Sequence, residues 1–381
     1  MTDKAPISIL QLRSSAGLYG ADRMVLALDQ GLSQRGARSR LLSINNYRLD
    51  DQLLHDCGAR AGQDVVLLPC RGKLDMRTVT ALGSQIDRCK ADVLHVHDYK
   101  SAFYAWLATR RRLQVKLVAT LHGWVEASRA LRLYNTLEIA LLRRFDALVV
   151  VSDNQVNRLS RAGIPAQRIQ QIDNGIVISR TGEPAPAALR AELGLENAGH
   201  VFAAVGRLSP EKNLALLLDA FTSVVARNPD ARLLLAGDGP ERQALQDKVA
   251  QLGLQGQVRF SGNRSDMEQV YPLIDCLVLP SLSEGMPLVV LEAMSRGIPV
   301  IASAVGEIPR LLANSQYGQV VARGDERALR AAMINSTAHP GRRDDKARNY
   351  VLAHHSSQAM AGKYLGLYQA LRAEGHDRKI A

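Results

Sequence analysis

The chemically most informative stretch of the sequence is SLSEGMPLVVLEAMSRGIPVIAS, residues 281–303, in which two glutamates flank and enter an apolar helix pattern. A strand pattern precedes it, Pro287 suits a first helical turn, and Gly297 suits the cap at the helix end. Glu284 is therefore expected in the loop before the helix, and Glu292 about one to two turns into it. Neither carboxylate stabilises an apolar core, so either both are solvated or both are held out for a ligand.

The start of this predicted helix has the chemistry of a phosphate site. Its first amides are free hydrogen-bond donors at the positive end of the helix dipole, and Gly285 lets the backbone approach a ligand closely. Glu284 would repel a phosphate there, but its oxygens suit the hydroxyls of a sugar. Glu292, deeper on the same side, suits a pair of ribose hydroxyls. The alternative is that Glu284 only favours the helix dipole and that Glu292 is a solvated helix residue.

A second loop, GRLSPEKNLALLLDAF at 206–221, also leaves a strand pattern and enters a helix pattern. It holds Arg207 and Lys212, five residues apart across a Gly-to-Pro turn. A diphosphate in a cleft needs countercharge of this kind, the arginine as a fork and the lysine as a point charge. Two cations on a loop are a weak signal alone, but this loop lies in the same half of the chain as the glutamate loop.

A third loop, SSAGLYGADRM at 14–24, places Gly17 and Gly20 in a flexible turn before a helix pattern. It lacks the complete G-x-G-x-x-G fingerprint. The segment LLLAGDGPER (233–242) carries Arg242 where the third glycine would stand, and no P-loop sequence is present. Neither an NAD site nor a P-loop NTPase is therefore predicted.

Three histidines end strand patterns in the first half of the chain. His95 and His97 alternate along one strand, and His122 follows another within TLHGW. All three are expected on the ligand-facing side of the first domain. A His-x-His pair could bind a metal, but no third ligand stands at a suitable spacing, so no metal site is predicted. For His122 two interpretations remain: a structural histidine with satisfied hydrogen bonds, or a neutral donor and acceptor that touches a substrate hydroxyl. Its place at a strand end favours the second.

Short apolar runs rich in β-formers alternate with longer helical patterns along the whole chain, and each loop above follows such a run. In the first half the runs are ISILQL (7–12), SRLLSI (39–44), DVVLLP (64–69), DVLHVH (92–97), KLVATLH (116–122) and ALVVVS (147–152). In the second half they are HVFAAVGRL (200–208), RLLLAGDG (232–239), VRFSG (258–262), CLVLPS (276–281), PVIAS (299–303) and GQVV (318–321). The runs are apolar on both faces and leave room for crossover helices, which predicts parallel sheets with helices on both sides.

The pattern predicts an α/β protein of two doubly wound, Rossmann-like domains that face a cleft. The N-terminal domain is expected over 1–178 and the C-terminal domain over 189–355. Between them the polar, proline-bearing stretch SRTGEPAPAA reads as a linker over 179–188. A last helix is expected over 356–381, packing back toward the N-terminal domain. In such sheets ligands bind beyond the carboxyl ends of the strands, where every motif above falls.

Composition narrows the class of protein. A chain of 381 residues, with 46% apolar and 22% charged residues, indicates a two-domain globular protein. No disulfide framework or zinc site is expected, and reduced thiols in a cytosol are the simpler interpretation, because no paired spacing links the four cysteines, Cys57, Cys70, Cys89 and Cys276. The first residues, MTDKAPISILQL, hold too short an apolar run for a signal peptide, and no run approaches the ~20 apolar residues of a membrane span.

The positive charge is concentrated in the first half. Residues 1–178 hold 25 Lys and Arg against 16 Asp and Glu, so they carry most of the net charge of +11. The basic stretches are ATRRRLQVK (108–116), SRALRLY (128–134) and LLRRFD (141–146). An anionic membrane surface is one candidate partner and a solvated basic surface is the alternative. Nucleic acid is not predicted, because aromatic residues are only 4% of the chain and no RNA or single-strand stacking motif is present.

Taken together, these segments resemble glycosyltransferase family 4, retaining enzymes of the GT-B fold. The resemblance is clearest from about residue 92 to 310. It is carried by GLYGADRM, VHD within DVLHVHDY, TLHG, VVVSD, IDNGI, VGRLSPEKN, LAGDGPER, VRFSG and, above all, by Glu284 and Glu292 within PSLSEGMPLVVLEAMSRGIPVIAS. The last motif, with Arg207 and Lys212 upstream of it, is specific; each of the others is weak alone.

The resemblance implies a role for each matching residue. Arg207 and Lys212 would hold the diphosphate of a nucleotide-sugar donor and offset charge on the leaving group. Glu284 would bind hydroxyls of the donor sugar, and Glu292 the ribose. The backbone amides that would close around sugar and phosphate are those of Gly285, Met286, Pro287 and Leu288, as far as each carries an N–H.

Further residues follow from the same resemblance. His122 would contact the donor sugar near the reacting carbon. Gly17 and Gly20 would let the first domain's loop approach the phosphates and the acceptor. Arg264 in SGNRSDM is a candidate near the base. Family members often read Gly-Gly-x-Pro-Glu after a late strand, where this chain has VGEIPRLL (305–312), so no donor contact is assigned to that loop.

The resemblance implies a hexosyltransferase-like, cytoplasmic enzyme that needs no metal or other cofactor, because no Asp-x-Asp is present. It would transfer a sugar from a nucleotide diphosphate sugar to a saccharide or lipid-linked acceptor in polysaccharide or glycolipid synthesis, and would bind peripherally to the inner face of the plasma membrane. The departing phosphate would take the acceptor's proton in a front-face reaction. Two alternatives remain: a GT-B-like epimerase of nucleotide sugars, and a non-catalytic sugar-nucleotide-binding module. The sequence names neither the base, the sugar nor the acceptor.

Overall fold

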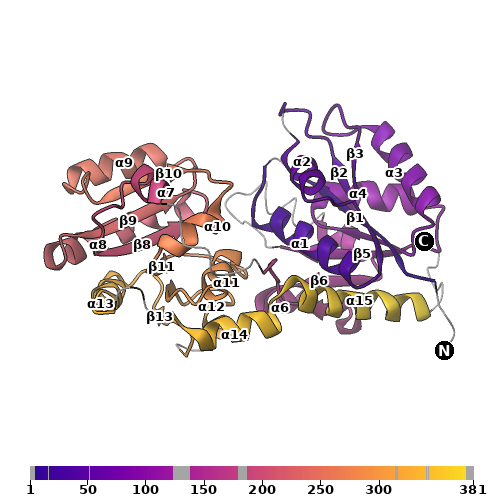
Figure 1. Ribbon diagram of the computed structural model, residues 1–381. Helices are drawn as coiled ribbons and strands as arrows, with labels where there is room; N and C mark the ends of the chain where they lie inside the picture. The colour runs from indigo at the N-terminus through magenta and orange to yellow at the C-terminus, as the bar shows by residue number, and fades with distance from the viewer. Residues whose placement is uncertain are drawn as a thin grey trace. The chain divides into compact units, whose positions relative to one another are not determined.

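The computed structural model describes residues 5–15, 17–50, 52–122, 138–178, 187–313, 316–339, 341 and 343–374. The chain divides into two compact units, Met1–Val177 with His354–Ala381, and Ile178–Ala353. Each unit is built on one parallel sheet with helices on both faces (Figure 1). Most of the predicted linker, 179–186, and the basic stretch 128–134 lie outside the described residues.

The first unit contains a seven-stranded parallel sheet in the order β3-β2-β1-β4-β5-β6-β7. Its strands are β1 (Ser8–Ser14), β2 (Arg38–Ile44), β3 (Val65–Leu68), β4 (Val93–Val96), β5 (Lys116–Leu121), β6 (Ala147–Val150) and β7 (Ile169–Gln171). The first six coincide with the predicted runs. The edge strand β7 was not predicted, because its sequence, Ile-Gln-Gln, is short and carries two exposed amides.

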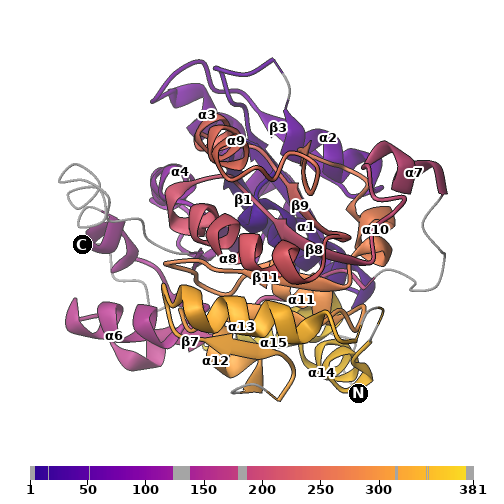
Figure 2. The ribbon, with the colours of Figure 1, turned by 90° about the vertical axis from the view of Figure 1, so that its left-hand side faces the viewer.

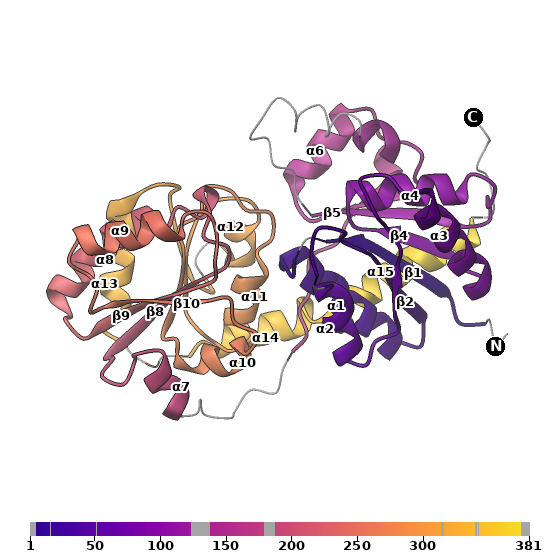
Figure 3. The same cartoon turned by 90° about the horizontal axis from the view of Figure 1, so that it is seen from above.

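Helices cover both faces of this sheet. They are α1 (Gly20–Gln34), α2 (Leu53–Arg60), α3 (Met76–Cys89), α4 (Tyr99–Thr109), α6 (Asp153–Arg161), the 3-10 turn η1 (Ala166–Arg168) and α15 (Ser357–Ala373). Leu10 and Leu12 of β1 join the core beneath α3 and α4. The intervening residue, Gln11, points to the opposite face because side chains alternate along a strand, and α1 and α15 pack together on that side (Figure 3).

Close backbone packing attaches α15 to the first unit. A Cβ at Gly31 of α1 would lie 2.5 Å from the carbonyl oxygen of Ser357, so only glycine fits there. The backbone of Ile176 accepts from Ser357 N at 2.7 Å and donates to the oxygen of His355 at 2.9 Å. Ser356 caps α15 by accepting a hydrogen bond from Ala359 N. Through these contacts α15, near the C-terminus, packs as part of the first unit.

The second unit contains a six-stranded parallel sheet in the order β10-β9-β8-β11-β12-β13 (Figure 2). Its strands are β8 (His200–Val205), β9 (Ala231–Ala236), β10 (Val258–Gly262), β11 (Cys276–Leu279), β12 (Val300–Ser303) and β13 (Gln319–Val321). Its helices and 3-10 turns are α7 (Ala187–Glu192), η2 (Pro210–Lys212), α8 (Leu214–Arg227), α9 (Arg242–Gln251), α10 (Met267–Val270), η3 (Tyr271–Leu273), α11 (Leu288–Met294), α12 (Ile308–Leu311), α13 (Glu326–Ser336) and α14 (Asp345–His354). All six strands coincide with predicted runs, and Phe202, Leu217 and Leu233 are fully buried in its core.

Within the described part of the chain, none of the helices has the length and hydropathy needed to cross a membrane. Each sheet supplies loops at the carboxyl ends of its strands, and the candidate residues lie on those loops or, for Glu292, on the helix that follows one of them.

Candidate active site

The loops that follow β8 and β11 meet at the carboxyl edge of the second sheet, because these two strands are neighbours. Lys212 Nζ lies 2.7 Å from Glu284 Oε1, and the Ser281 hydroxyl donates to the same oxygen at 2.7 Å. The backbone N of Leu282 donates to the oxygen of Glu211 at 2.8 Å, which joins the two loops directly. A cation and a carboxylate that are 72 residues apart in sequence thus form one site.

Arg207 extends from the same loop as Lys212. Its side chain is exposed and forms no hydrogen bond or ion pair with any residue that the structure describes. Burial alone would raise the pKa of Glu211. The Ser209 hydroxyl, the backbone and the charges of Lys212 and Arg207 have the larger, opposite effect, so the pKa of Glu211 lies below its usual value. Arg207 therefore offers an open, positively charged fork beside the Lys212–Glu284 pair.

Two glycines of the β9 loop hold the Arg207 loop in place. A Cβ at Gly237 would lie 1.8 Å from the oxygen of Gly206, and one at Gly239 would lie 2.3 Å from the oxygen of Leu208. Leu208 N also donates to the oxygen of Asp238 at 3.0 Å. The G-D-G sequence, which does not match a dinucleotide fingerprint, is thus required for close packing of two loop backbones.

Residues 285–288 connect the strand to α11. Pro287 is the N-cap in extended conformation and Leu288 begins the helix. The side chains of Met286 and Leu288 are buried, so this segment is fixed by its own packing. Gly285 has no side chain and contacts its neighbour through the backbone: its carbonyl oxygen accepts a hydrogen bond from Glu307 N at 3.0 Å.

Glu292 lies on α11, as predicted, and accepts a hydrogen bond from the Tyr271 hydroxyl. The guanidinium of Arg296 stacks over the Tyr271 ring, 4.6 Å from its centroid, and donates to the backbone oxygen of Glu292 at 3.0 Å. Tyr271 has no sequence motif of its own and was missed. Its role is to fix the orientation of the carboxylate, which is partly exposed.

The loop after β12 packs directly on the glutamate loop. Gly306 has a φ of +53°, and a Cβ there would lie 2.2 Å from the oxygen of Glu284 and 2.6 Å from that of Gly285. Glu307 is buried and pairs with Arg310 at 2.6 Å. No donor contact is assigned to this loop, but its close packing constrains the backbone of Glu284 and Gly285. The only trace of this packing in the sequence was the glycine itself, a residue that tolerates positive φ and close backbone approach.

Arg264 follows β10 but is already engaged. Its guanidinium forms ion pairs with Asp266 at 2.6 Å and Glu192 at 2.7 Å, and these hydrogen bonds raise its pKa further. An arginine bound by two carboxylates has less capacity for a ligand than Arg207 has. The structure does not bring Arg264 into contact with the Lys212–Glu284 pair by any described hydrogen bond.

In the first unit the three strand histidines lie on the face of the sheet that α15 covers. His95 and His97 are buried, and His122 is partly exposed. His97 Nδ1 lies 3.3 Å from His122 Nε2, and Arg13 donates to the backbone oxygen of His97 at 2.6 Å. The prediction that all three histidines reach the ligand-facing side is wrong for His95 and His97, which are both buried; the Tyr368 hydroxyl of α15 lies 2.7 Å from His95 Nδ1.

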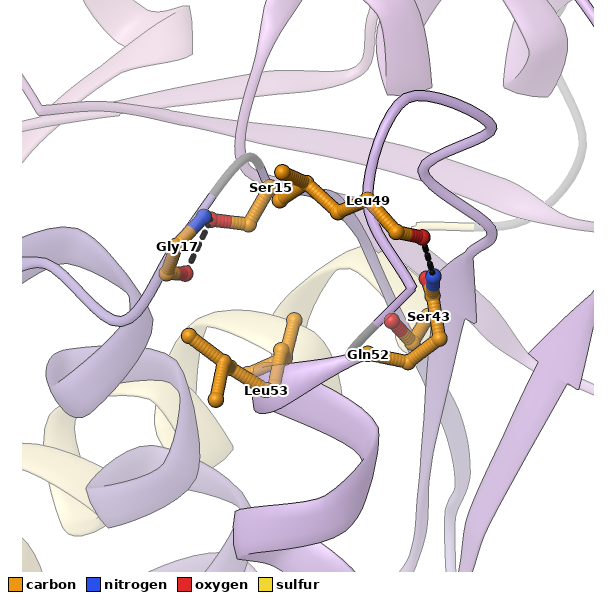
Figure 4. Close-up of a pocket in the computed structure, with 7 residues that line it drawn as sticks. Ser15, Gly17, Ser43, Leu49, Gln52 and Leu53 are labelled. Atoms are coloured by element: carbon orange, nitrogen blue, oxygen red, sulfur yellow. Dashed lines mark hydrogen bonds between the residues drawn. The ribbon is translucent and has the colours of Figure 1, made fainter.

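The Gly17 loop is braced by its own side chains (Figure 4). Ser15 Oγ donates to the Gly17 oxygen at 2.6 Å, and a Cβ at Gly17 would lie 2.8 Å from the ring of Tyr19. Gly20 begins α1 and faces open space, so no steric contact requires a glycine there. Ser15 and Gly17 line a small pocket with Leu49, Gln52 and Leu53, shown in the same view.

The structure therefore groups Arg207, Lys212, Glu284 and the 285–288 backbone at one edge of the second sheet, with Glu292 on the helix that follows. His122 and the Gly17 loop end strands of the first unit. Within the described ranges no cluster of three or more His, Cys, Asp or Glu residues could hold a metal ion.

Comparison with known proteins gives a consistent result for both units. The family model described as Glycosyl transferases group 1 matches residues 187–350, and that described as Glycosyltransferase Family 4 matches residues 19–180. The D-inositol 3-phosphate glycosyltransferase of Mycobacterium sp. (strain JLS) is 33% identical over 332 residues, covering 79% of this chain and 74% of that protein. The UDP-Gal:alpha-D-GlcNAc-diphosphoundecaprenol alpha-1,3-galactosyltransferase of Escherichia coli is 28% identical over 288 residues, 72% of each chain.

The fold is also found in solved structures. Anabaena Alr3699/HepE, in complex with UDP and glucose, superposes with a TM-score of 0.81 at 20% identity, covering 96% of this chain and 100% of that one. At this identity the likeness concerns the fold, and it confirms the predicted class of two Rossmann-like α/β domains.

Proposed function

This chain belongs to glycosyltransferase family 4 and is a retaining glycosyltransferase that uses a nucleotide-sugar donor, and on that premise we propose that it moves a hexose from a UDP-sugar to a lipid-linked saccharide in the synthesis of a cell-surface glycan. The nucleotide and acceptor are suggested by the E. coli relative, whose name specifies UDP-Gal and a diphosphoundecaprenol-linked sugar. The observation that carries the proposal is the Lys212–Glu284 pair beside the open Arg207, because a nucleotide sugar carries a dianionic diphosphate next to a hydroxylated ring.

The second unit, over the predicted range 189–355, is the proposed donor-binding domain. Arg207 and Lys212 hold the diphosphate, and the backbone N–H groups within 285–288 approach it. Glu284 accepts hydrogen bonds from hydroxyls of the sugar. Glu292, oriented by its neighbouring tyrosine, accepts hydrogen bonds from the ribose.

The cations do the chemical work of leaving-group departure. The bond from the sugar's anomeric carbon to the diphosphate oxygen breaks, and the acceptor hydroxyl forms the new bond on the same face. Its proton passes to the departing phosphate. Arg207 and Lys212 stabilise the negative charge that develops on the leaving group. Arg264, bound by its two carboxylates, lies outside this set in our proposal, which replaces its sequence-based assignment near the base.

The first unit is the proposed acceptor-side domain, with His122 near the reacting carbon and the Gly17 loop near the phosphates and the acceptor. Tyr47, Leu49 and Leu53 after β2 are exposed hydrophobic residues. Arg48 and Lys100 place their cationic groups 5.5 and 5.6 Å from the centroid of the Tyr47 ring. Apolar side chains flanked by cations suit a lipid-linked acceptor that carries phosphate, and a peripheral position on an anionic leaflet.

A thermal-shift panel of nucleotide diphosphate sugars tests the donor assignment. The true donor stabilises the protein as RT ln(1 + [L]/Kd), so about 2.7 kcal/mol is expected at a hundredfold excess over Kd. Arg207→Ala and Glu292→Ala should each lose most of this stabilisation. Matched controls are Arg227→Ala, an exposed cation at the far end of α8, and Glu268→Ala, an exposed carboxylate on α10. Equal donor stabilisation in Arg207→Ala and Arg227→Ala would refute the assignment.

Two further assays separate the alternatives. Incubation of the true donor without an acceptor should leave the sugar unchanged; its conversion to an epimer would identify an epimerase. Flotation with liposomes should recover more protein when anionic lipid is present, by roughly 1 kcal/mol for each cation near the surface. The double variant Arg48→Ser/Lys100→Ser should lose this preference. Equal recovery with neutral and anionic vesicles would exclude the membrane part of the proposal.

A further inference from the structure

His122 ends a continuous chain of side chains on the covered face of the first sheet. Its Nε2 lies 3.3 Å from His97 Nδ1, and the other nitrogen of that ring, Nε2, lies 2.7 Å from Gln11 Oε1. Gln11 and His97 are buried, whereas His122 is partly exposed. The two imidazoles stack with their centroids 5.5 Å apart.

A second run of hydrogen bonds continues toward α15. Tyr368 OH lies 2.7 Å from His95 Nδ1, His95 Nε2 lies 2.7 Å from Thr120 Oγ1, and Thr120 Oγ1 lies 2.9 Å from Tyr364 OH. Within the described residues Gln11 Nε2 is buried without a partner at bonding distance. Burial raises the pKa of the Tyr368 phenol well above its usual value, while Gln11 acts on that phenol in the lowering direction. The end of the Gln11 side chain that faces His97 is its amide oxygen, 2.7 Å from His97 Nε2.

The three rings are neutral at physiological pH. Burial lowers the pKa of His95 to about 3. Burial and then the charges of neighbouring groups, Arg13 among them, also lower the pKa of His97 and of His122 well below the usual value. A neutral imidazole carries one N–H and one bare nitrogen, so each ring donates once and accepts once.

The orientation of Gln11 sets the direction of the chain. A carbonyl oxygen only accepts, so His97 must donate to Gln11 through Nε2–H, and its Nδ1 must be the bare nitrogen. His122 must then donate to that nitrogen through its own Nε2–H. Its remaining nitrogen, Nδ1, is bare, and it has no hydrogen-bond partner within the described part of the chain.

From these contacts we propose that His97 is a positioning residue: held by Gln11, it fixes His122 in the tautomer protonated on Nε2 and so presents Nδ1 of His122 as a hydrogen-bond acceptor for a hydroxyl of the donor sugar. The inference rests on the proposed function for the identity of that ligand, but the tautomer itself does not. Neutral His122 is then neither a general acid nor a counter-ion. It selects donor sugars that carry a hydroxyl at the contacted position over their deoxy analogues.

The tautomer can be read directly. Full-length protein labelled with 15N-histidine is observed by long-range imidazole 15N–1H correlation at pH 7.5, and the signals are assigned with His122→Gln and His97→Gln. We expect His122 and His97 each to carry the proton on Nε2, with a bare Nδ1. A proton on Nδ1 of His122, or averaging between the two tautomers, would overturn the proposal.

Two substitutions at position 97 separate positioning from packing. Asparagine places an oxygen near the position of Nδ1, so His97→Asn keeps an acceptor for His122. Glutamine reaches the position of Nε2 instead, so His97→Gln keeps contact with Gln11 and loses that acceptor. We expect His97→Gln to lower kcat by about tenfold and to give a mixed His122 tautomer, a loss equivalent to one hydrogen bond in the transition state. His97→Asn should recover most of this loss and keep the tautomer.

The outcomes distinguish the inference from the function on which it rests. Equal loss of kcat in both position-97 variants, in proportion to their loss of stability in urea, would mean that His97 only packs. If His122→Gln itself retained full activity, the proposed contact of His122 with the donor would be wrong, while the 15N measurement would still decide whether His97 sets the tautomer.

Discussion

The Lys212–Glu284 pair offers the sharpest test of the site, because its strength can be estimated from its surroundings. The two side chains are 20% and 10% exposed, and their charged atoms lie 2.7 Å apart. Replacing Lys212 by methionine leaves the Glu284 carboxylate with one neutral donor, the Ser281 hydroxyl. A charge-assisted hydrogen bond in such a setting contributes about 1.5–3 kcal/mol, so Lys212→Met should lower the free energy of unfolding by roughly 2 kcal/mol.

Replacing the other member of the pair should lower the free energy of unfolding by less. Glu284→Gln leaves behind Lys212, which is the more exposed partner and can turn to water, so a loss of about 1 kcal/mol is expected. In the double variant no charge is left without its partner, and the total loss should be about 1.5 kcal/mol. The resulting interaction energy of about 1.5 kcal/mol is within the range for residues in direct contact.

The assay is urea unfolding of the full chain at fixed pH. Because the two units need not unfold together, the free energy is taken from the transition in which the second unit unfolds. Lys248→Met is the matched control, because Lys248 pairs with Asp219 at the same distance of 2.7 Å but at 27% and 40% exposure. That surface pair should contribute no more than about 1 kcal/mol. An interaction energy within about 0.3 kcal/mol of zero, or an equal loss of stability in Lys248→Met, would refute the reasoning that Lys212 and Glu284 form a coupled, partly buried ion pair.

Three further predictions follow from single residues. Gly306→Ala should abolish donor stabilisation in a thermal-shift assay, because its Cβ would collide with the Glu284 carbonyl oxygen. The control Gly324→Ala, also at positive φ but in open space, should lose only about 1 kcal/mol of stability. Unchanged donor binding in Gly306→Ala would contradict this. Tyr368→Phe leaves His95 Nδ1 without its buried hydrogen-bond partner and should lower the free energy of unfolding by about 1–3 kcal/mol in urea; an unchanged stability would contradict this. Burial lowers the pKa of His95 from 6.5 to about 3, so between these pH values the unfolded chain binds a proton that the native chain does not. The free energy of unfolding should therefore fall as pH drops below 6.5, by up to about 1.4 kcal/mol per pH unit for this ring. In His95→Gln this dependence of stability on pH should be weaker.

The sheets could be predicted from sequence because their strands are short apolar runs, and central strands such as β4, β5 and β11 are buried on both faces. CLVLPS, for example, has no polar alternation, and twelve of the thirteen strands in the described part of the chain coincide with a predicted run. The exception, β7, is an edge strand whose exposed glutamines resemble a loop. Strand order is less visible, since it depends on which neighbours fit between helices rather than on any one segment.

The site residues also differ in whether the sequence could identify them. Arg207, Lys212, Glu284 and Glu292 were found because charged residues at strand ends have no role in a core, and that argument is local. Tyr271 could not be found, because a buried tyrosine is ordinary and its contact with Glu292 crosses 21 residues. Arg264 was identified as a cation near a strand end, but the two carboxylates that hold it could not be foreseen.

The strand histidines show why residue type alone could not separate structure from function. His95, His97 and His122 share one face of the sheet, and their sequence contexts differ little. What separates them is α15, whose tyrosines lie more than 240 residues away in sequence and cover the His95 end. Burial decreases from His95 and His97 to His122. An enclosed ring such as His95 cannot meet a ligand itself, whereas His122 at the edge can, and in our proposal its proton is fixed by the buried His97 beside it.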